Sequence, residues 1–261
     1  MQGDPIEDYV FPVLLFAFAI GGWEAYVRIG HVPPYLLPAP SLVIETLIED
    51  WSTLYASLLV TLGTTFQALV AAIVGGVALA LVFRLWRPLE RAFFPFAVVM
   101  QVTPVVSIAP LLLVYLTSGM AVLVCAFLVA FFPILSNTAL GLASAEHNLV
   151  DLFELYGASK VQQLLLLRVP AALPYFLGGV RIGGGLALIG AIVAEIAAGS
   201  AGSGSGLAYR IVESGFRLNI PRMFAALFLI SVTGIVIYLC LTVLSYFLLH
   251  RWHESARGRD R

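Results

Sequence analysis

The sequence predicts an all-α polytopic membrane protein with six transmembrane helices. Hydrophobic residues make up 61% of the 261 residues and charged residues only 11%, a balance that suits a bilayer better than water. Several apolar runs have the length of about 20 residues that crosses a bilayer as an α-helix. Because such crossings use much of the chain, no large soluble domain fits beside them.

Six apolar segments meet this length. They are residues 9–27, 57–83, 93–117, 120–143, 171–197 and 223–249, with approximate ends. Each is expected to be helical because a helix satisfies its own backbone N–H and C=O groups in lipid. The first is expected to remain as an anchor, since acidic residues precede it and no small-residue cleavage site follows. The expected division is 1–56 for this anchor and an outer loop, 57–249 for a five-helix core, and 250–261 for a tail.

Basic residues in the short loops predict the orientation. One side carries Arg84, Arg87, Arg91, Lys160, Arg168, Arg251, Arg257, Arg259 and Arg261. The other side carries Arg28, Arg210, Arg217 and Arg222. Cytoplasmic loops are enriched in Lys and Arg, so we expect a multi-pass protein with both termini in the cytoplasm.

The loop after the first segment is rich in proline, and Ser41 is the first residue expected to cap a helix there. From Leu42 to Trp51 the apolar residues recur at helical spacing. Two interpretations stay open for this short helix: it lies at the outer membrane interface, or it packs on the bundle.

The third and fourth segments combine polar side chains with prolines. Gln101, Pro104 and Ser107 lie in the third, and Asn137 follows Pro133 in the fourth. Broken backbone at membrane depth is tolerated where protein or a water-filled cavity surrounds it. We therefore expect these residues to line a translocation pathway. The alternative is that the prolines only kink packed helices and the polar groups bond to neighbouring helices.

The fifth segment holds glycines and two charged residues. Gly179 and Gly183 have the G-x-x-x-G spacing that lets two helices approach closely, either within the chain or across a homodimer seam. Arg181 and Glu195 share a helix face, but about 21 Å separates them along the axis, so they cannot pair with each other. Neither can face hydrocarbon. We expect a structural or gating role for Arg181 and an outer-gate or dimer contact for Glu195.

A mostly polar stretch, DLFELYGASKVQQLLLLRVPAALP, separates the fourth and fifth segments. Its pattern predicts two short helices that meet near Gly157 and form a rigid knob, and Pro170 is expected to end the helix before it. Its spacing begins at an acidic residue, with a glycine six positions later. Ten residues after the glycine comes an apolar residue, followed by one variable residue, a second apolar residue and a proline. These positions are Asp151, Gly157, Leu167, Val169 and Pro170.

This spacing resembles the EAA loop, the signature of permeases of binding-protein-dependent ABC importers. Other stretches resemble the nitrate/sulfonate/taurine type of these permeases: LPAPS, SLLVTLGTTFQAL, FPILSNTALG and GGVRIGGGLALIGAIVAEIAAG. The resemblance extends from Leu37 onward and implies the type I ABC importer permease fold in a bacterial inner membrane. It also implies coupling helices at about 146–168.

The resemblance implies partners for the chain. They are a second copy of the permease, two copies of an ABC ATPase subunit and an extracytoplasmic substrate-binding protein, besides membrane lipid and without nucleic acid. The implied contact with the ATPase comprises Asp151, Leu152, Phe153, Glu154, Tyr156, Gly157, Ala158, Ser159, Leu167 and Pro170. Leu152 and Phe153 depart from the family's two alanines, which predicts a bulkier knob.

No catalytic residue, metal site or bound cofactor is expected in this chain. It has no G-x-x-x-x-G-K-[ST] motif, so ATP and Mg are expected on the partner ATPase. An ion-coupled secondary transporter is the alternative, but the spans offer no Asp or His to carry a proton or cation. A membrane-embedded enzyme fits less well, because the four histidines of this chain are scattered along the sequence and form no cluster for a catalytic site. The substrate is expected to be a small anion of the nitrate, sulfonate or taurine kind, or a small organic molecule.

Overall fold

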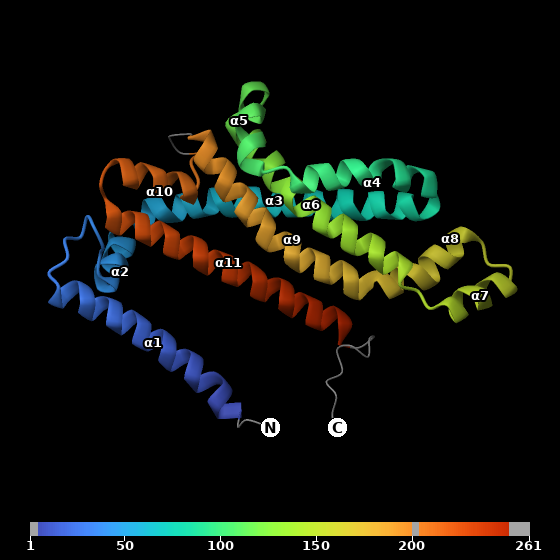
Figure 1. Ribbon diagram of the computed structural model, residues 1–261, viewed down its shortest axis with the longest axis horizontal. Helices are drawn as coiled ribbons and strands as arrows, with labels where there is room; N and C mark the ends of the chain where they lie inside the picture. The colour runs from blue at the N-terminus through green and yellow to red at the C-terminus, as the bar shows by residue number, and fades with distance from the viewer. Residues whose placement is uncertain (1–4, 200–203, 251–261) are drawn as a thin grey trace.

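The computed structural model describes residues 5–199 and 204–250, and this part of the chain folds into helices joined by loops (Figure 1). The helices are α1 (Pro5–Ile29), α2 (Pro40–Glu49), α3 (Trp51–Leu85), α4 (Arg87–Val102), α5 (Val105–Tyr115), α6 (Ser118–Ala143), α7 (His147–Leu155), α8 (Lys160–Gln163), the π-helical turn η1 (Leu164–Arg168), α9 (Val169–Ala198), α10 (Leu207–Phe216) and α11 (Ile220–Leu249). Residues 251–261 of the predicted tail 250–261, with its four arginines, lie outside the described residues.

The predicted all-α polytopic fold is confirmed. Five helices among the described residues are long and apolar enough to cross a membrane: Val10–Ile29, Trp51–Leu85, Ser118–Ala143, Lys160–Ala198 and Ile220–Leu249. The pair α4 and α5 passes the same test jointly, which gives six crossings when it is taken as one broken span.

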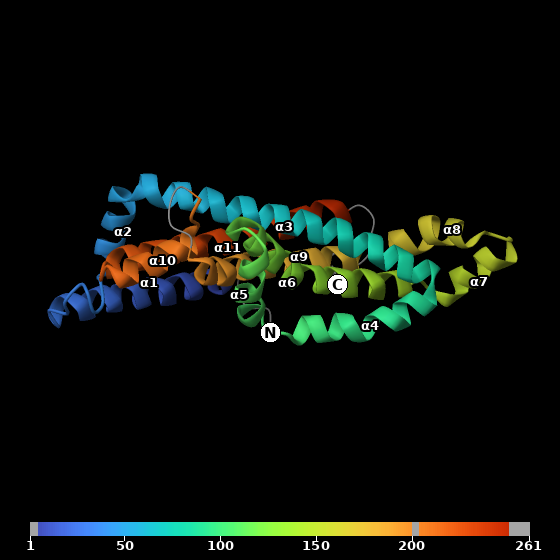
Figure 2. The ribbon, with the colours of Figure 1, turned by 90° about the horizontal axis from the view of Figure 1, so that it is seen from above.

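The third predicted segment is therefore not one helix. It divides between Val102 and Val105, and the two halves are bent by 99°. Thr103 is extended (ψ 123°), as expected for a residue that precedes a proline, and Pro104 has no N–H to continue the ladder of α4. In Figure 1, α5 projects from the bundle, and Figure 2 shows that α4 meets α3 at one end and diverges from it.

The centre of the bundle is the contact between α6 and α9, the most extensive between any two helices (Figures 1 and 2). Glycines on α9 allow this approach. A Cβ added at Gly179 would lie 2.8 Å from the Cβ of Asn137, and one at Gly190 would lie 2.9 Å from the Cα of Ala126. Gly183 likewise packs against Ile134 of α6. The faces of the G-x-x-x-G pair thus meet another helix of the same chain.

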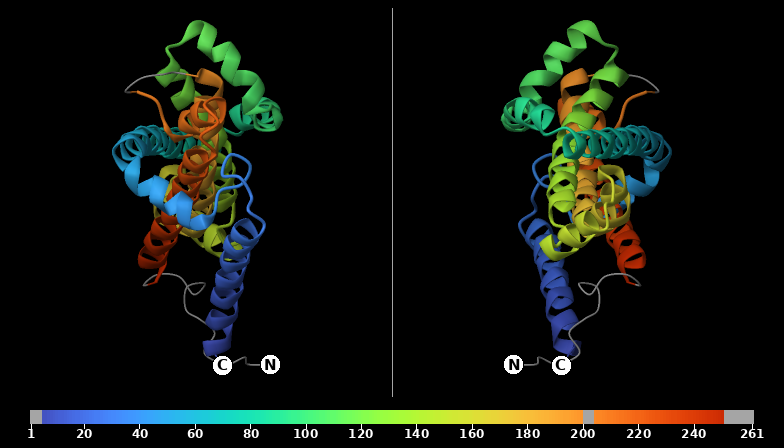
Figure 3. Two further views of the ribbon diagram at one scale, coloured as in Figure 1. Left: turned by 90° about the vertical axis from the view of Figure 1, so that its left-hand side faces the viewer. Right: turned by 90° about the vertical axis from the view of Figure 1, so that its right-hand side faces the viewer.

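The elongated molecule has two distinct ends (Figures 1 and 2). The short helices α2 and α10 lie at one, and α7 and α8 lie at the other. Helix α1 stands apart from the bundle (Figure 3) and contacts it near the α2–α10 end, where Trp23 packs on Phe224 of α11 with ring centroids 5.7 Å apart.

The prediction that Ser41 caps α2 is wrong. Ala39 is the N-cap and Pro40 occupies the first turn, where its missing N–H needs no partner. Ser41 instead ties α2 to α1, because its Oγ donates to Glu24 Oε1 at 2.7 Å and its backbone N–H donates to Oε2 at 3.0 Å.

The prediction that Pro170 ends the preceding helix is also wrong. The chain stays helical from Lys160 to Ala198, with the π-helical turn Leu164–Arg168 just before the proline. A π-helical turn adds one residue to the turn and changes the hydrogen-bond register, so it can accommodate a residue that has no N–H.

The substitution Gly179→Ala tests the α6–α9 contact. The added methyl group overlaps Asn137, so the free energy of unfolding should fall by about 1–3 kcal/mol, as is typical of overpacked cores. Reversible unfolding in mixed detergent measures it. The control is Gly63→Ala in α3, whose added Cβ has no neighbour within 4 Å. Equal stability of the two variants would contradict the role assigned to Gly179.

Candidate functional site

The α7–α8 end carries a compact, exposed knob. Helix α7 ends at Leu155, and Gly157 then reverses the chain with φ +70°, a conformation that disfavours other residues. Ser159 begins α8 with a capping box: its Oγ accepts from the N–H of Gln162 at 3.2 Å, and its own N–H donates to Gln162 Oε1 at 2.8 Å. The reversal is therefore held on both sides of Gly157.

The residues predicted to contact an ATPase differ in exposure. Six of them project from the knob and its flanks, namely Asp151, Leu152, Glu154, Tyr156, Gly157 and Ser159. Phe153 and Ala158 are half-buried, and the N–H of Ala158 donates to the Phe153 carbonyl at 2.9 Å within the reversal. Leu167 is buried, so it contributes to the core, while Pro170 is exposed on the adjoining helix. The sequence analysis missed Leu155, which is 85% exposed next to Tyr156 at 84%.

The bend between α4 and α5 exposes the predicted pathway residues Gln101, Pro104 and Ser107. Gln101 lines a hollow of about 410 Å³ between α4 and α6, together with Ser136. Asn137 is on a different face of α6: it packs against α9, and its Nδ2 donates to the Pro133 carbonyl at 2.8 Å. The described structure thus separates Asn137 from the hollow that Gln101 lines.

Arg181 lies beside an exposed stripe of α9. In this stripe Ile182 and Ile189 are exposed, whereas Gly178 and Gly185 are half-buried, and added Cβ atoms at these glycines would meet nothing within 4 Å. The Nε of Arg181 is buried and has no hydrogen-bond partner among the described residues. The Arg181 guanidinium group therefore lies near the middle of α9, next to a helix face that the described part of the chain leaves uncovered.

Glu195 is buried at the α2–α10 end, where it is 5% exposed. Thr61 of α3 donates its hydroxyl to Glu195 Oε1 at 2.8 Å, and the N–H of Ala208 donates to Oε2 at 3.1 Å. The N–H of Leu207 donates in turn to Thr61 Oγ1 at 2.9 Å. The carboxylate thus takes the place of an N-cap for α10 and joins three helices, α3, α9 and α10.

Gly206 makes this arrangement possible. It is the N-cap of α10, and a Cβ at this position would overlap the Glu195 carboxyl group. The sequence analysis identified Glu195 but missed Thr61 and Gly206, because no local spacing connects three positions so far apart in the chain.

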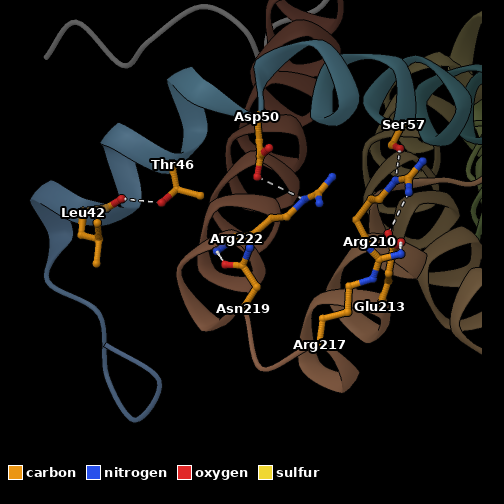
Figure 4. A network of polar contacts seen from close by, with 9 residues as sticks. All are labelled: Leu42, Thr46, Asp50, Ser57, Arg210, Glu213, Arg217, Asn219 and Arg222. Atoms are coloured by element: carbon orange, nitrogen blue, oxygen red, sulfur yellow. Dashed lines mark hydrogen bonds and ion pairs between the residues drawn. The ribbon is translucent and has the colours of Figure 1, made fainter. Parts of the chain in front are cut away.

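A second polar network surrounds α10 (Figure 4). Arg210 donates to Ser57 of α3 at 2.9 Å and pairs with Glu213 at 2.8 Å, while Arg217 pairs with Glu213 at 2.9 Å. Arg222 of α11 pairs with Asp50 at 3.3 Å. The hydrogen bond from Arg210 holds the pKa of the Glu213 carboxyl below its usual range. This network fixes α10 between α3 and α11.

Among the described residues, no group of three or more His, Cys, Asp or Glu side chains is arranged to hold a metal ion. The two distinctive features of this part of the chain are the exposed α7–α8 knob and the break between α4 and α5 in the membrane bundle.

The amino-acid sequence of this chain also matches a known protein family. The family described as binding-protein-dependent transport system inner membrane component matches residues 72–255. The chain belongs to this family. It is therefore the permease component of a transporter and not itself an enzyme, and the predicted ABC importer permease fold is confirmed.

Relatives of this permease cover nearly its whole length. A probable ABC transporter permease of Haemophilus influenzae is 32% identical over 92% of this chain and 96% of its own. A formylaminopyrimidine transport permease of Halalkalibacterium halodurans is 36% identical over 86% of this chain and 89% of its own. A riboflavin transport system permease of Chloroflexus aurantiacus is 34% identical over 89% and 86%. Sulfonate and taurine permeases also match, which confirms the predicted likeness to that group.

The substitution Gly206→Ala should free α10 from the permease core. The methyl group overlaps the Glu195 carboxyl group, so the N–H of Ala208 should lose its acceptor. A buried donor left unsatisfied costs about 1–3 kcal/mol, and amide hydrogen exchange over residues 207–216 should accelerate roughly tenfold or more. The control is Gly204→Ala, whose Cβ would meet nothing within 4 Å. Unchanged exchange in Gly206→Ala would refute the capping role.

Proposed function

We propose that the permease works as a homodimer with two ATPase subunits and a substrate-binding protein, and that it imports a small solute by alternating access. The α7–α8 knob is the observation that carries this proposal. ATP and Mg bind to the partner ATPase, and closure of that partner moves the membrane helices through the knob.

The knob has the properties of a docking element. Leu155 and Tyr156 are almost fully exposed at its tip, and such apolar and aromatic side chains anchor protein interfaces when a partner buries them. The capping box of α8 keeps the tip rigid. Because α8 continues through η1 into α9, a force on the knob reaches a central helix of the bundle without a flexible joint.

The distribution of charge supports a cytoplasmic position for the knob. The four described arginines at the α2–α10 end, Arg28, Arg210, Arg217 and Arg222, all pair with carboxylates. Arg84, Arg87, Lys160 and Arg168 at the α7–α8 end take part in no such pair among the described residues. The positive excess therefore lies at the α7–α8 end, and the positive-inside rule favours the cytoplasm for it and for both termini.

The open stripe of α9 supports a pathway between two copies. An arginine at mid-span is too costly in hydrocarbon, so the flank that holds Arg181 faces protein or water. The bend at Pro104 requires the same surroundings, because broken backbone is not stable in lipid. A second permease placed against this side would enclose a pathway lined by Gln101, Ser107 and Arg181, with Glu195 holding the outer end closed through α10.

The relatives suggest the class of substrate. Those at 36% and 34% identity are named for formylaminopyrimidine and riboflavin, whereas those named for sulfonates and taurine are 25% and 24% identical. We therefore favour a planar nitrogen heterocycle over a small inorganic or sulfonate anion. A thermal-shift screen of the cognate binding protein with both classes decides this, and stabilisation by taurine or nitrate alone would reverse it.

The substitution Tyr156→Asp tests the coupling. A charge at the tip of the knob should be costly to bury against the ATPase, so a tagged ATPase should co-purify at least tenfold less with this variant. Uptake driven by ATP in vesicles should fall in parallel. The control is Tyr35→Asp, an exposed tyrosine at the opposite end. Normal co-purification and uptake with Tyr156→Asp would exclude the knob as the docking element.

The variants Gln101→Ala, Ser107→Ala and Arg181→Gln test the pathway. Each should reduce uptake severalfold while the complex with the ATPase forms normally, because Gln101 and Ser107 are exposed and Arg181 lies beside the open face of α9. Co-purification and uptake are measured on the same membranes. Loss of assembly together with uptake would show instead that the residues serve packing.

A further inference from the structure

Four basic side chains line one hollow at the α7–α8 end. Arg84, Arg87, Lys160 and Arg168 surround a space of about 490 Å³ between the end of α3, the start of α4 and the α8–η1 turn. We call it the basic hollow. Glu154 is the carboxylate in its lining.

The basic hollow keeps a surplus of positive charge. Arg84 is near enough to Arg87 and Arg168 for mutual repulsion, and the fixed carbonyl of Leu142 accepts from only one nitrogen of Arg168, at 3.3 Å. Within residues 5–199 and 204–250, the ion pairs found lie at the opposite end of the molecule. An anion bound among these side chains would relieve the repulsion.

The hollow continues toward the membrane interior. A second space of about 540 Å³ shares Arg84 and Arg87 with it and adds Arg91, Glu90 and Phe94. The 410 Å³ hollow between α4 and α6 shares Glu90 and Phe94 with this second space and is lined mainly by apolar side chains, among them Phe83 and Phe132. We call this last space the α4–α6 groove. A cationic site and an apolar groove therefore lie end to end.

We propose that this surface binds an anionic phospholipid, with the phosphate in the basic hollow and an acyl chain in the α4–α6 groove. Arginine forks match phosphate oxygens, and the hollow lies where the apolar span of α3 ends at Leu85. A free anion or an acidic side chain of a protein would occupy only the basic hollow. A phospholipid also explains the groove, because one molecule carries both the charge and the chain.

Such a lipid would support α4, which is attached loosely to its neighbours. Helix α4 has no buried residues, and Figure 2 shows it set apart from α6 along much of its length. A chain in the groove would supply apolar contacts there, and the phosphate would hold the start of α4 to α8. The proposal does not depend on the identity of the substrate or on the coupling mechanism. It does bear on the proposed pathway, because Gln101 lines the α4–α6 groove and cannot contact an acyl chain and a solute at the same time.

Native mass spectrometry of the full chain tests the proposal, with phosphatidylglycerol and phosphatidylcholine offered in equal amounts. The chain should retain phosphatidylglycerol preferentially. The double variant Arg84→Gln/Arg168→Gln should retain about thirtyfold less of it, as expected for two lost charges near an anionic lipid. The charge-matched control, Arg28→Gln/Arg217→Gln at the α2–α10 end, should retain as much as the native chain. Equal retention of the two lipids, or no loss in the first double variant, would overturn the proposal.

The groove and the other possible occupants need separate measurements. Ala97→Phe should fill the groove and lower phosphatidylglycerol retention severalfold, while binding of inorganic phosphate stays unchanged. No effect of this variant would mean a site for a free anion. Displacement of the lipid by the added ATPase would mean that the hollow belongs to that partner. Each of these results would overturn the proposal.

Thermal unfolding of the same proteins controls for folding. Phosphatidylglycerol should raise the unfolding temperature of the native chain but not that of Arg84→Gln/Arg168→Gln. If this double variant does not fold, Lys160→Gln replaces it, because Lys160 is exposed. Unchanged retention and unchanged stabilisation in Lys160→Gln would then count against the basic hollow.

Discussion

The close contact of α6 with α9 is the constraint on which the rest of the molecule depends. Glycines at three levels of α9 let its backbone approach α6 almost without intervening side chains. In lipid there is little hydrophobic force between helices, so this kind of contact is a main source of their association. Once one face of α9 is committed to α6, Arg181 and its neighbours are directed to the open side, and Glu195 is directed to α3 and α10.

The two ends of the bundle differ in whether their basic side chains are paired with carboxylates. At the α2–α10 end, each described arginine pairs with a carboxylate, and Figure 4 shows the pairs around α10. Glu195 is enclosed there by N–H and O–H donors. That end is a set of rigid joints between helices. At the α7–α8 end, Arg84, Arg87, Lys160 and Arg168 form no ion pair within the described residues, and apolar side chains are exposed, so that end is open to other molecules.

Prolines show why local rules gave only part of the fold. Pro133 and Pro174 lie inside long helices, Pro104 separates α4 from α5, and Pro170 follows a π-helical turn. Each proline lacks an N–H and therefore removes one backbone hydrogen bond, which is evident from the sequence alone. Whether the helix then stops, bends or continues depends on what surrounds the freed carbonyl groups, which is a property of the packed bundle.

The sequence by itself determined the membrane class, the approximate positions of five spans, the family and the turn at Gly157. These follow from hydropathy, from the length of a crossing and from a local spacing, and none of them needs distant contacts. The tertiary structure alone decided that Thr61 and Gly206 meet Glu195, that Gln101 and Asn137 face different spaces, and that basic residues from α3, α4, α8 and η1 share one hollow. Those contacts join positions up to 146 residues apart, and no local pattern specifies which buried groups will satisfy one another.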